Sequence, residues 1–209
     1  MDRLRTAETR SDERRATILD AALEVFTDYG FRRTSLEDIA RRAEISRTGL
    51  YHHFSSKEEI FHAMVERCHQ LTHTEAAAAL HSDAPLEDRL LASMEAKLGF
   101  FFGKATSTRH GAQVLSMGYR IGNDITLLWT GRYLEIMTEA FEKAAADGQI
   151  DPSCIGADAR SAAGFMILSA EGQQGPANNP PSPGRYTRRL RREIRITIQA
   201  LGGTVRPGF

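Results

Sequence analysis

A short polar and aromatic stretch near residue 50 carries the groups best suited to recognise another molecule. It begins with Arg47, and an arginine guanidinium can donate two hydrogen bonds to O6 and N7 of guanine, a pairing worth about 1–3 kcal/mol of discrimination. Thr48 can form a hydrogen bond to a base or contact the methyl group of thymine. Gly49 lets a helix backbone approach DNA closely, at a cost of about 1 kcal/mol in helix propensity. Together these residue types suit the reading of base edges in a DNA groove.

Two short helices joined by a tight turn are predicted to position these groups. Thr34 or Ser35 can cap the first helix, and Asp38 stands in a capping-box arrangement with Ser35. The first helix has one apolar face, because its apolar residues recur at helical spacing: Leu36, Ile39, Ala40 and Ala43. A turn then leads to Ser46, which can cap the second helix. This arrangement is a helix-turn-helix, and its second helix is the element that enters a major groove.

The pattern around these helices resembles the tetracycline-repressor-like (TetR) family of one-component regulators. The resemblance covers about the first third of the chain and rests on Ile18 to Ala22, Phe26, Gly30, Thr34-Ser35, Asp38-Ile39-Ala40, Ser46, Gly49-Leu50-Tyr51, His53-Phe54 and Ser56-Lys57-Glu58. Glu44 departs from the pattern, because it stands at the turn position where the family usually has glycine. If the turn needs a positive φ there, a residue other than glycine is strained.

The resemblance extends the set of predicted DNA contacts. Tyr51, His52 and Lys57 match family positions that usually contact phosphates or bases, and the start of the first motif helix offers free amides to a phosphate. The predicted contacts are therefore Thr34, Ser35, Arg47, Thr48, Gly49, Tyr51, His52 and Lys57. In the competing interpretation, Tyr51 packs in the core and Arg47 is a solvated charge. We favour DNA contact for these two residues and a core position for Phe54.

The distribution of charge agrees with this assignment, whereas the total does not decide it. The chain has 27 basic and 27 acidic residues, so the sequence as a whole offers no field that would attract nucleic acid. Basic residues outnumber acidic ones between residues 32 and 57, and again between 185 and 195. Basic groups on a helix-turn-helix fit contact with phosphates. The arginines before residue 16 are diluted by acids, and they fit a DNA-binding tail and a disordered tail equally well.

The remainder of the chain is predicted to be helical, which makes the protein all-α with about nine helices. Apolar residues recur at helical spacing from residue 13 onwards, and no segment shows convincing strand alternation. A looser segment at 104–110 and a loop rich in proline and glycine at 172–184 interrupt the helices. We predict a three-helix DNA-binding domain at 12–72, with its helix-turn-helix at 35–54. The resemblance implies that the helical bundle at 73–204 binds an effector and forms the dimer.

Several large side chains of the C-terminal bundle could line an effector pocket. Trp129 and Tyr133 are the best candidates, because each brings a polar group that a buried site must satisfy. The predicted pocket residues are Trp129, Tyr133, Met94, Phe101 and Met137. Their spacing is explained equally well by ordinary core packing. Such a pocket favours an apolar or aromatic small molecule.

Two segments of the bundle are predicted to form a homodimer interface. Residues 157–171 are rich in alanine and glycine, which allow helices to approach closely, and residues 185–201 carry a narrow aliphatic stripe. The resemblance places these two helices in a four-helix interface between protomers. The alternative is that both helices are satisfied within one chain. A two-fold dimer implies a palindromic operator on double-stranded DNA.

Other functions fit the sequence less well than DNA binding. His62, His69 and His73 share a helical stretch and could bind a metal, but Gln70 stands where a metalloprotease needs its glutamate, and a solvated histidine face is favoured. We find no glycine-rich phosphate loop, nucleophile elbow or recognisable carboxylate pair, so we predict no enzyme and no cofactor. Cys68 and Cys154 could sense redox state, although inert thiols are favoured.

The sequence therefore predicts a homodimeric transcriptional regulator that an effector releases from its operator. Without a signal peptide or an apolar run long enough to span a bilayer, we expect it in the cytoplasm. Repression is the favoured mode. A TetR-like activator, and a metal-binding protein or enzyme that uses His62, His69 and His73, are the alternatives.

Overall fold

The computed structural model describes residues 2–173 and 181–206, and within them all side chains except those of residues 2–10, 119 and 121. The predicted loop at 172–184 therefore lies largely outside the described residues. No strand occurs in the described part of the chain, in agreement with the predicted all-α class. None of its helices is long and apolar enough to cross a membrane.

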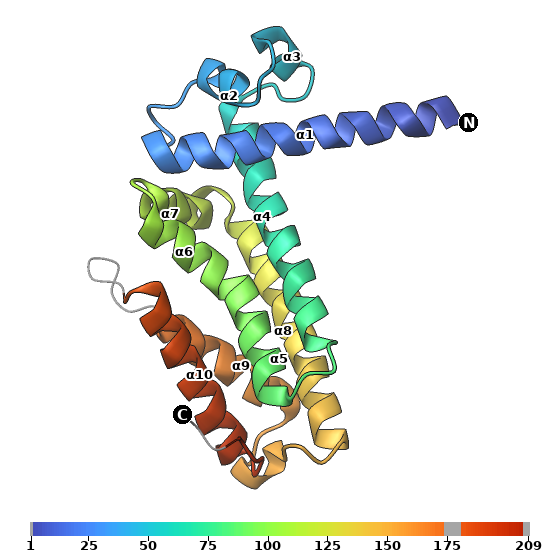
Figure 1. The fold of residues 1–209 in the computed structure, drawn as a ribbon, viewed down its shortest axis with the longest axis vertical. Helices are drawn as coiled ribbons and strands as arrows, with labels where there is room; N and C mark the ends of the chain where they lie inside the picture. The colour runs from blue at the N-terminus through green and yellow to red at the C-terminus, as the bar shows by residue number, and fades with distance from the viewer. Residues whose placement is uncertain (1, 174–180, 207–209) are drawn as a thin grey trace. The chain divides into compact units, whose positions relative to one another are not determined.

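Helices account for most of the described chain (Figure 1). Segments α5, the π-helical turn η1 and α6 follow one another without a break, so the described residues contain nine continuous helices besides the short 3-10 turn η2, as predicted. The elements are α1 (Asp2–Tyr29), α2 (Leu36–Arg42), α3 (Arg47–Tyr51), α4 (Lys57–Leu80), α5 (Leu86–Met94), η1 (Glu95–Gly99), α6 (Phe100–Ser107), α7 (Gly111–Ile121), α8 (Asn123–Ala146), the 3-10 turn η2 (Pro152–Ile155), α9 (Ala159–Gly172) and α10 (Pro183–Ala200).

The chain forms two compact units. The first contains Met1–Cys68 with Lys104–Thr126, and the second contains His69–Gly103 with Leu127–Phe209. Helices α4, α6 and α8 each contribute residues to both units. The first unit thus includes α7 besides the predicted three-helix motif, whereas the boundaries at 12–72 and 73–204 remain a prediction about function.

The first unit is built around a cluster of three phenylalanine rings. Phe26 from α1, Phe31 from the following turn and Phe61 from α4 lie with ring centroids 5.2–5.6 Å apart. Aromatic pairs at this separation are favourable beyond the area that they bury. Ile39 of α2 and Leu50 of α3 are fully buried in the same unit. Each of the short helices is therefore held by one apolar side packed inside the unit.

The second unit has a larger core, to which α5, α8, α9 and α10 all contribute. The predicted stripe of α10 is buried within this chain, through Tyr186, Leu190, Ile194 and Ile198. Phe102 stacks on Tyr186, with ring centroids 4.3 Å apart. Because α10 packs on both α5 and α9, it closes this core from one side (Figure 1).

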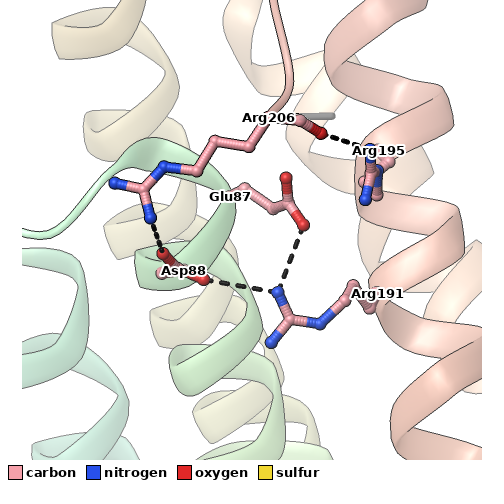
Figure 2. A network of polar contacts seen from close by, with 5 residues as sticks. All are labelled: Glu87, Asp88, Arg191, Arg195 and Arg206. Carbon is pink, nitrogen blue, oxygen red and sulfur yellow. Dashed lines mark hydrogen bonds and ion pairs between the residues drawn. The ribbon is translucent and has the colours of Figure 1, made fainter. Parts of the chain in front are cut away.

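Ion pairs at the surface accompany the packing of α10 on α5 (Figure 2). Arg191 lies 3.2 Å from Glu87 and 3.3 Å from Asp88, while Arg206 lies 3.8 Å from Asp88. Arg195 donates a hydrogen bond to the backbone carbonyl of Arg206. Pairs that remain partly in water each contribute at most about 1 kcal/mol. Burial of the apolar stripe is therefore the main force that holds α10.

Two helix boundaries differ from those predicted. Helix α1 begins at Asp2 rather than near residue 13, because residues 2–12 contain no glycine or proline and include three arginines, which favour helix. Helix α6 continues to Ser107, into the segment predicted to be looser. The side chain of Thr108 then bonds back to the carbonyl of Lys104 at 2.7 Å, and the chain turns.

Gly111, at the start of α7, provides a test of this turn. A Cβ atom added at Gly111 would overlap the backbone carbonyl of Lys104 and the hydroxyl of Thr108. We expect Gly111→Ala to lower the free energy of unfolding by about 1–3 kcal/mol, measured by urea denaturation, because overpacking forces the turn to shift.

Gly131, in the middle of α8, is the matched control. No atom lies within 4 Å of a Cβ added there, so Gly131→Ala should stabilise the protein by about 0.5–1 kcal/mol through helix propensity. Equal stability of the two variants would contradict the close approach at Gly111.

Candidate functional site

Helix α3 is short, and its position is fixed by a cap and by two buried side chains. The hydroxyl of Ser46 accepts a hydrogen bond from the amide of Gly49 at 3.0 Å, which confirms the predicted N-cap. Leu50 and Phe54 are 0% and 1% exposed, and they anchor one side of this segment. A Cβ at position 49 would come within 3.2 Å of the Ser46 hydroxyl, so glycine also leaves room for the cap.

Helix α2 carries the predicted capping box. The hydroxyl of Ser35 accepts a hydrogen bond from the amide of Asp38 at 3.2 Å, and the Asp38 carboxylate accepts one from the amide of Ser35 at 3.0 Å. The side-chain and backbone hydrogen bonds from Ser35 hold the pKa of Asp38 below its ordinary value. The box fixes the start of α2, so the direction in which the helix leaves the preceding turn is set locally.

The turn between α2 and α3 does need a positive φ at Glu44. This residue has φ +55°, the one positive value outside glycine among the described residues. The amide of Glu44 donates a hydrogen bond to the carbonyl of Arg41 at 3.2 Å, and the amide of Ile45 donates one to the carbonyl of Ala40 at 3.0 Å. These bonds close the turn, although the left-handed conformation costs about 1–2 kcal/mol for a residue with a side chain.

The side of α3 away from the core is exposed and basic. Arg47, Thr48 and His52 are exposed, and Tyr51 is 46% exposed. Arg47 and Tyr51 are one helical turn apart, with the guanidinium 3.4 Å from the phenol oxygen and 5.7 Å from the ring centroid. The hydrogen bond with Tyr51 raises the pKa of Arg47, which is charged at any physiological pH. The pair therefore presents a cation and a hydroxyl on one surface.

Lys57 and Thr34 have partners inside the first unit. The ammonium of Lys57 donates hydrogen bonds to the carbonyls of Phe31 at 2.8 Å and Thr34 at 2.9 Å, and it lies 4.5 Å from the Phe31 ring centroid. Thr34 is 3% exposed, and its hydroxyl bonds to the carbonyl of Gly30 at 2.9 Å. Together these contacts fix the segment that leads into α2.

Several arginines near the motif are held by neighbouring groups. Arg15 lies over the Phe54 ring at 4.1 Å and donates a hydrogen bond to the carbonyl of His53 at 3.0 Å. Arg41 pairs with Asp38, and Arg42 pairs with Glu24. The local basic charge is therefore partly neutralised within the unit, and the exposed Arg47 stands out at the start of α3.

The predicted pocket residues all lie in the second unit. Met94, Tyr133 and Met137 are at most 1% exposed within its core, Trp129 is 7% exposed, and Phe101 is half-buried. The phenol oxygen of Tyr133 lies 3.4 Å from the hydroxyl of Ser93, and burial raises the pKa of Tyr133. Met94, Tyr133 and Met137 therefore belong to the apolar core of the second unit, whereas Trp129 and Phe101 lie beside a polar group.

That polar group is Lys97, which is not among the predicted site residues. Lys97 lies in η1 and is 4% exposed, with its ammonium 3.1 Å from Nδ1 of His69 on α4. Burial lowers the pKa of Lys97 to about 8, so the ammonium keeps its proton at neutral pH. Burial and the charge of Lys97 lower the pKa of His69 to about 3, so the imidazole is neutral and can accept the hydrogen bond.

Aromatic rings surround this lysine. Its ammonium lies 5.8 Å from the ring of Phe101 and 6.0 Å from that of Trp129, and the Trp129 ring lies 5.3 Å from that of His73 between centroids. We call these five residues the Lys97 cluster: His69, His73, Lys97, Phe101 and Trp129. A charged residue within the apolar stripe from Leu90 to Phe101 was the signal in the sequence that could have revealed it.

Among the described residues, the histidines do not lie together with other metal-binding side chains, and the two cysteines are not joined by a disulfide bond. His69 and His73 contact Lys97 and Trp129, and no group of three or more metal-binding side chains occurs among the described residues. Cys68 is buried, and burial raises the pKa of its thiol to about 11. Cys154 is exposed and unbridged, and its thiol bonds to the carbonyl of Ala200 at 3.2 Å.

Comparison with known sequences identifies the helix-turn-helix unit. The family model for bacterial regulatory proteins of the tetR family matches residues 18–64. The transcriptional activator FasR of Mycolicibacterium smegmatis is 34% identical over 139 residues, which cover 65% of this chain and 58% of FasR. The A-factor receptor protein of Streptomyces griseus is 46% identical over 50 residues, or 24% of this chain and 18% of that protein. The chain therefore spans less than two thirds of these relatives.

Comparison with solved structures extends the similarity to most of the chain. SmeT, the repressor of the Stenotrophomonas maltophilia multidrug efflux pump SmeDEF, has a TM-score of 0.64 and 26% identity, with 89% of each chain covered. PfmR, a TetR family regulator of Thermus thermophilus, shares the fold with a TM-score of 0.59 and 22% identity, over 90% of this chain and 99% of PfmR. Motif, sequence and fold agree: residues 18–64 match the DNA-binding region of the tetR family of bacterial regulatory proteins, and most of the chain shares the fold of TetR family regulators.

Proposed function

We propose that this protein binds double-stranded DNA sequence-specifically as a homodimer, and that it represses transcription until a small molecule releases it from a palindromic operator. The observation that carries the proposal is the exposed Arg47–Tyr51 pair on α3, a helix whose other side is anchored by buried Leu50. This is the arrangement that a recognition helix needs, because base readout requires polar side chains on a rigidly placed surface.

Within this proposal some of the predicted residues contact DNA directly, and others position the residues that do. Arg47, Thr48, Tyr51 and His52 are exposed and can reach base edges or phosphates, with Gly49 allowing close approach. Ser35 is exposed at the start of α2, near the backbone amides that could bind a phosphate. Thr34 and Lys57 would act mainly by positioning this segment, because their side chains already bond to carbonyl groups within the unit.

The proposed dimer uses apolar side chains that this chain leaves exposed. Phe165 and Leu168 lie one turn apart on α9 and are 61% and 69% exposed, and Ile196 on α10 is 50% exposed. The other large apolar side chains of the two helices are buried within the chain: Met166, Ile167, Tyr186, Leu190, Ile194 and Ile198. A second copy would cover the exposed residues, and the two α3 helices of such a dimer would read two half-sites.

The direction of regulation is a separate part of the proposal. Repression is supported by SmeT, a repressor that matches most of this chain, and activation by the name of FasR. In either mode an effector can change DNA affinity only by binding the two states of the protein with different affinity. We propose an apolar or aromatic effector near Trp129 and Phe101, and a protein that acts on the chromosome in the cytoplasm and is not an enzyme.

Replacement of Arg47 tests the recognition surface. We expect Arg47→Ala to weaken binding to a site selected from random DNA by roughly tenfold to a hundredfold, equivalent to about 1–3 kcal/mol, and to relax specificity at one base pair per half-site. The measurement is fluorescence anisotropy with competitor DNA at two salt concentrations.

Lys143→Ala serves as the matched control, because it removes one exposed positive charge from α8 in the second unit. It should leave DNA affinity unchanged. If the folded protein selects no DNA sequence, or if Arg47→Ala binds as well as the parent, the proposed recognition surface is wrong.

A charge on α9 tests the proposed dimer. We expect Leu168→Arg to convert the dimer into monomer, because a guanidinium would be buried without a partner at the interface. Sedimentation equilibrium gives the mass directly. Leu71→Arg places the same side chain on an exposed apolar position of α4 and should remain dimeric. A dimeric Leu168→Arg variant would move the interface away from this part of α9.

A further inference from the structure

The Lys97 cluster contains a buried cation without an anionic partner. Lys97 is 4% exposed, and among the described residues no carboxylate forms an ion pair with it. Its polar neighbour is the neutral His69, which occupies one of the three N–H donors of the ammonium. Lysine is almost never fully buried unless it is paired, since a charge in the interior loses its hydration.

Two further polar atoms near this lysine have no hydrogen-bond partner. Nε1 of Trp129 and Nε2 of His73 are both buried, and neither is bonded to any group in the described structure. The rings that carry them lie 5.3 Å apart, and the Trp129 ring is 6.0 Å from the ammonium. An indole N–H can only donate, and an imidazole can donate from Nε2 when Nδ1 is unprotonated. The cluster thus contains two buried ring nitrogens that have no hydrogen-bond partner among the described residues, close to a buried ammonium.

The backbone at Lys97 is itself irregular. Residues Glu95–Gly99 form a π-helical turn between α5 and α6, with Lys97 at its centre. Such turns are rare and are found frequently at functional sites. The guanidinium of Arg132 adds a second cation at 4.6 Å from the Trp129 ring. Charge, unused donors and backbone irregularity therefore coincide at one place in the second unit.

We propose that the Lys97 cluster binds the carboxylate of a small aromatic acid. The carboxylate accepts hydrogen bonds from Lys97, Trp129 and His73, and its aromatic body packs against Phe101 and the Trp129 ring. A carboxylate has about four acceptor positions, which suits a site with several neighbouring donors, and aromatic neighbours favour an aromatic body over a hydrated inorganic anion. Assigning this acid as the effector rests on the proposed function, whereas the binding site itself does not depend on DNA.

Trp129 makes the test direct, because it is the single tryptophan of the chain. Tryptophan fluorescence of the full-length protein is titrated with phenylacetate and, separately, with the uncharged 2-phenylethanol. We expect a saturable change with phenylacetate and an affinity weaker by roughly tenfold or more for the alcohol, because only the acid forms charge-assisted hydrogen bonds. Equal affinity for the two compounds would overturn anion recognition. An absence of saturation with both phenylacetate and benzoate would overturn the assignment of the ligand class, as would an equal response to phosphate.

Variants at Lys97 separate charge recognition from general packing. Lys97→Met should lose phenylacetate binding by roughly tenfold or more while its melting temperature stays the same or rises, since an unpaired buried cation is removed. Lys143→Met removes an exposed lysine from α8 and should leave both titrations unchanged. If Lys97→Met does not fold, the acid-to-alcohol comparison in the parent protein still decides the proposal. Unchanged phenylacetate binding by a folded Lys97→Met variant would overturn it.

DNA anisotropy, measured with and without phenylacetate, then distinguishes this inference from the proposed function. Fluorescence saturation in a protein that selects no DNA would uphold the acid site and contradict the proposed function. Specific DNA binding without any fluorescence response would uphold the regulator and contradict the acid site.

Discussion

The five-residue length of α3 is the constraint on which the proposed recognition surface depends. An isolated helix this short is unstable in water, because nucleation costs more than one turn of hydrogen bonds returns. Its conformation is therefore supplied by the Ser46 cap, by buried Leu50 and Phe54, and by the turn at Glu44. The Phe26, Phe31 and Phe61 rings provide the core of this unit, and Lys57 fixes the segment before α2. Because the buried side and the cap hold α3 in place, its exposed side chains are not needed for stability and are available for binding.

The second unit has a well-packed apolar core that contains one unfavourably buried charge. Its core is continuous around Met94, Tyr133 and Met137, which are all at most 1% exposed. Lys97 differs from these core residues, since its burial is unfavourable and its one hydrogen bond to His69 does not replace full hydration. Groups that weaken a fold are often retained where they serve a ligand. The physical cost of Lys97 is thus the reason to look for an anion there.

The arrangement of α9 and α10 shows how one apolar pattern can serve two purposes. The strongest stripe, on α10, is buried within this chain, so it contributes to the core and not directly to a dimer. The residues left for a second copy are Phe165 and Leu168 on α9 with Ile196 on α10. Periodicity alone could not separate these sets, because a helix that is apolar on two sides gives the same local pattern whichever side meets the partner.

The sequence by itself determined the helical class, the caps at Ser35 and Ser46 and the exposed chemistry of Arg47, and it marked Glu44 as a residue that would be strained if its φ were positive. These features depend on residues within about one turn of one another, so local chemistry is sufficient to specify them. Only the tertiary structure decided that Lys57 bonds to carbonyls 23 and 26 residues away, and that Lys97 meets His69 across 28 residues. Burial and the identity of a buried polar partner arise when distant segments pack together, and no local pattern of residues contains that information.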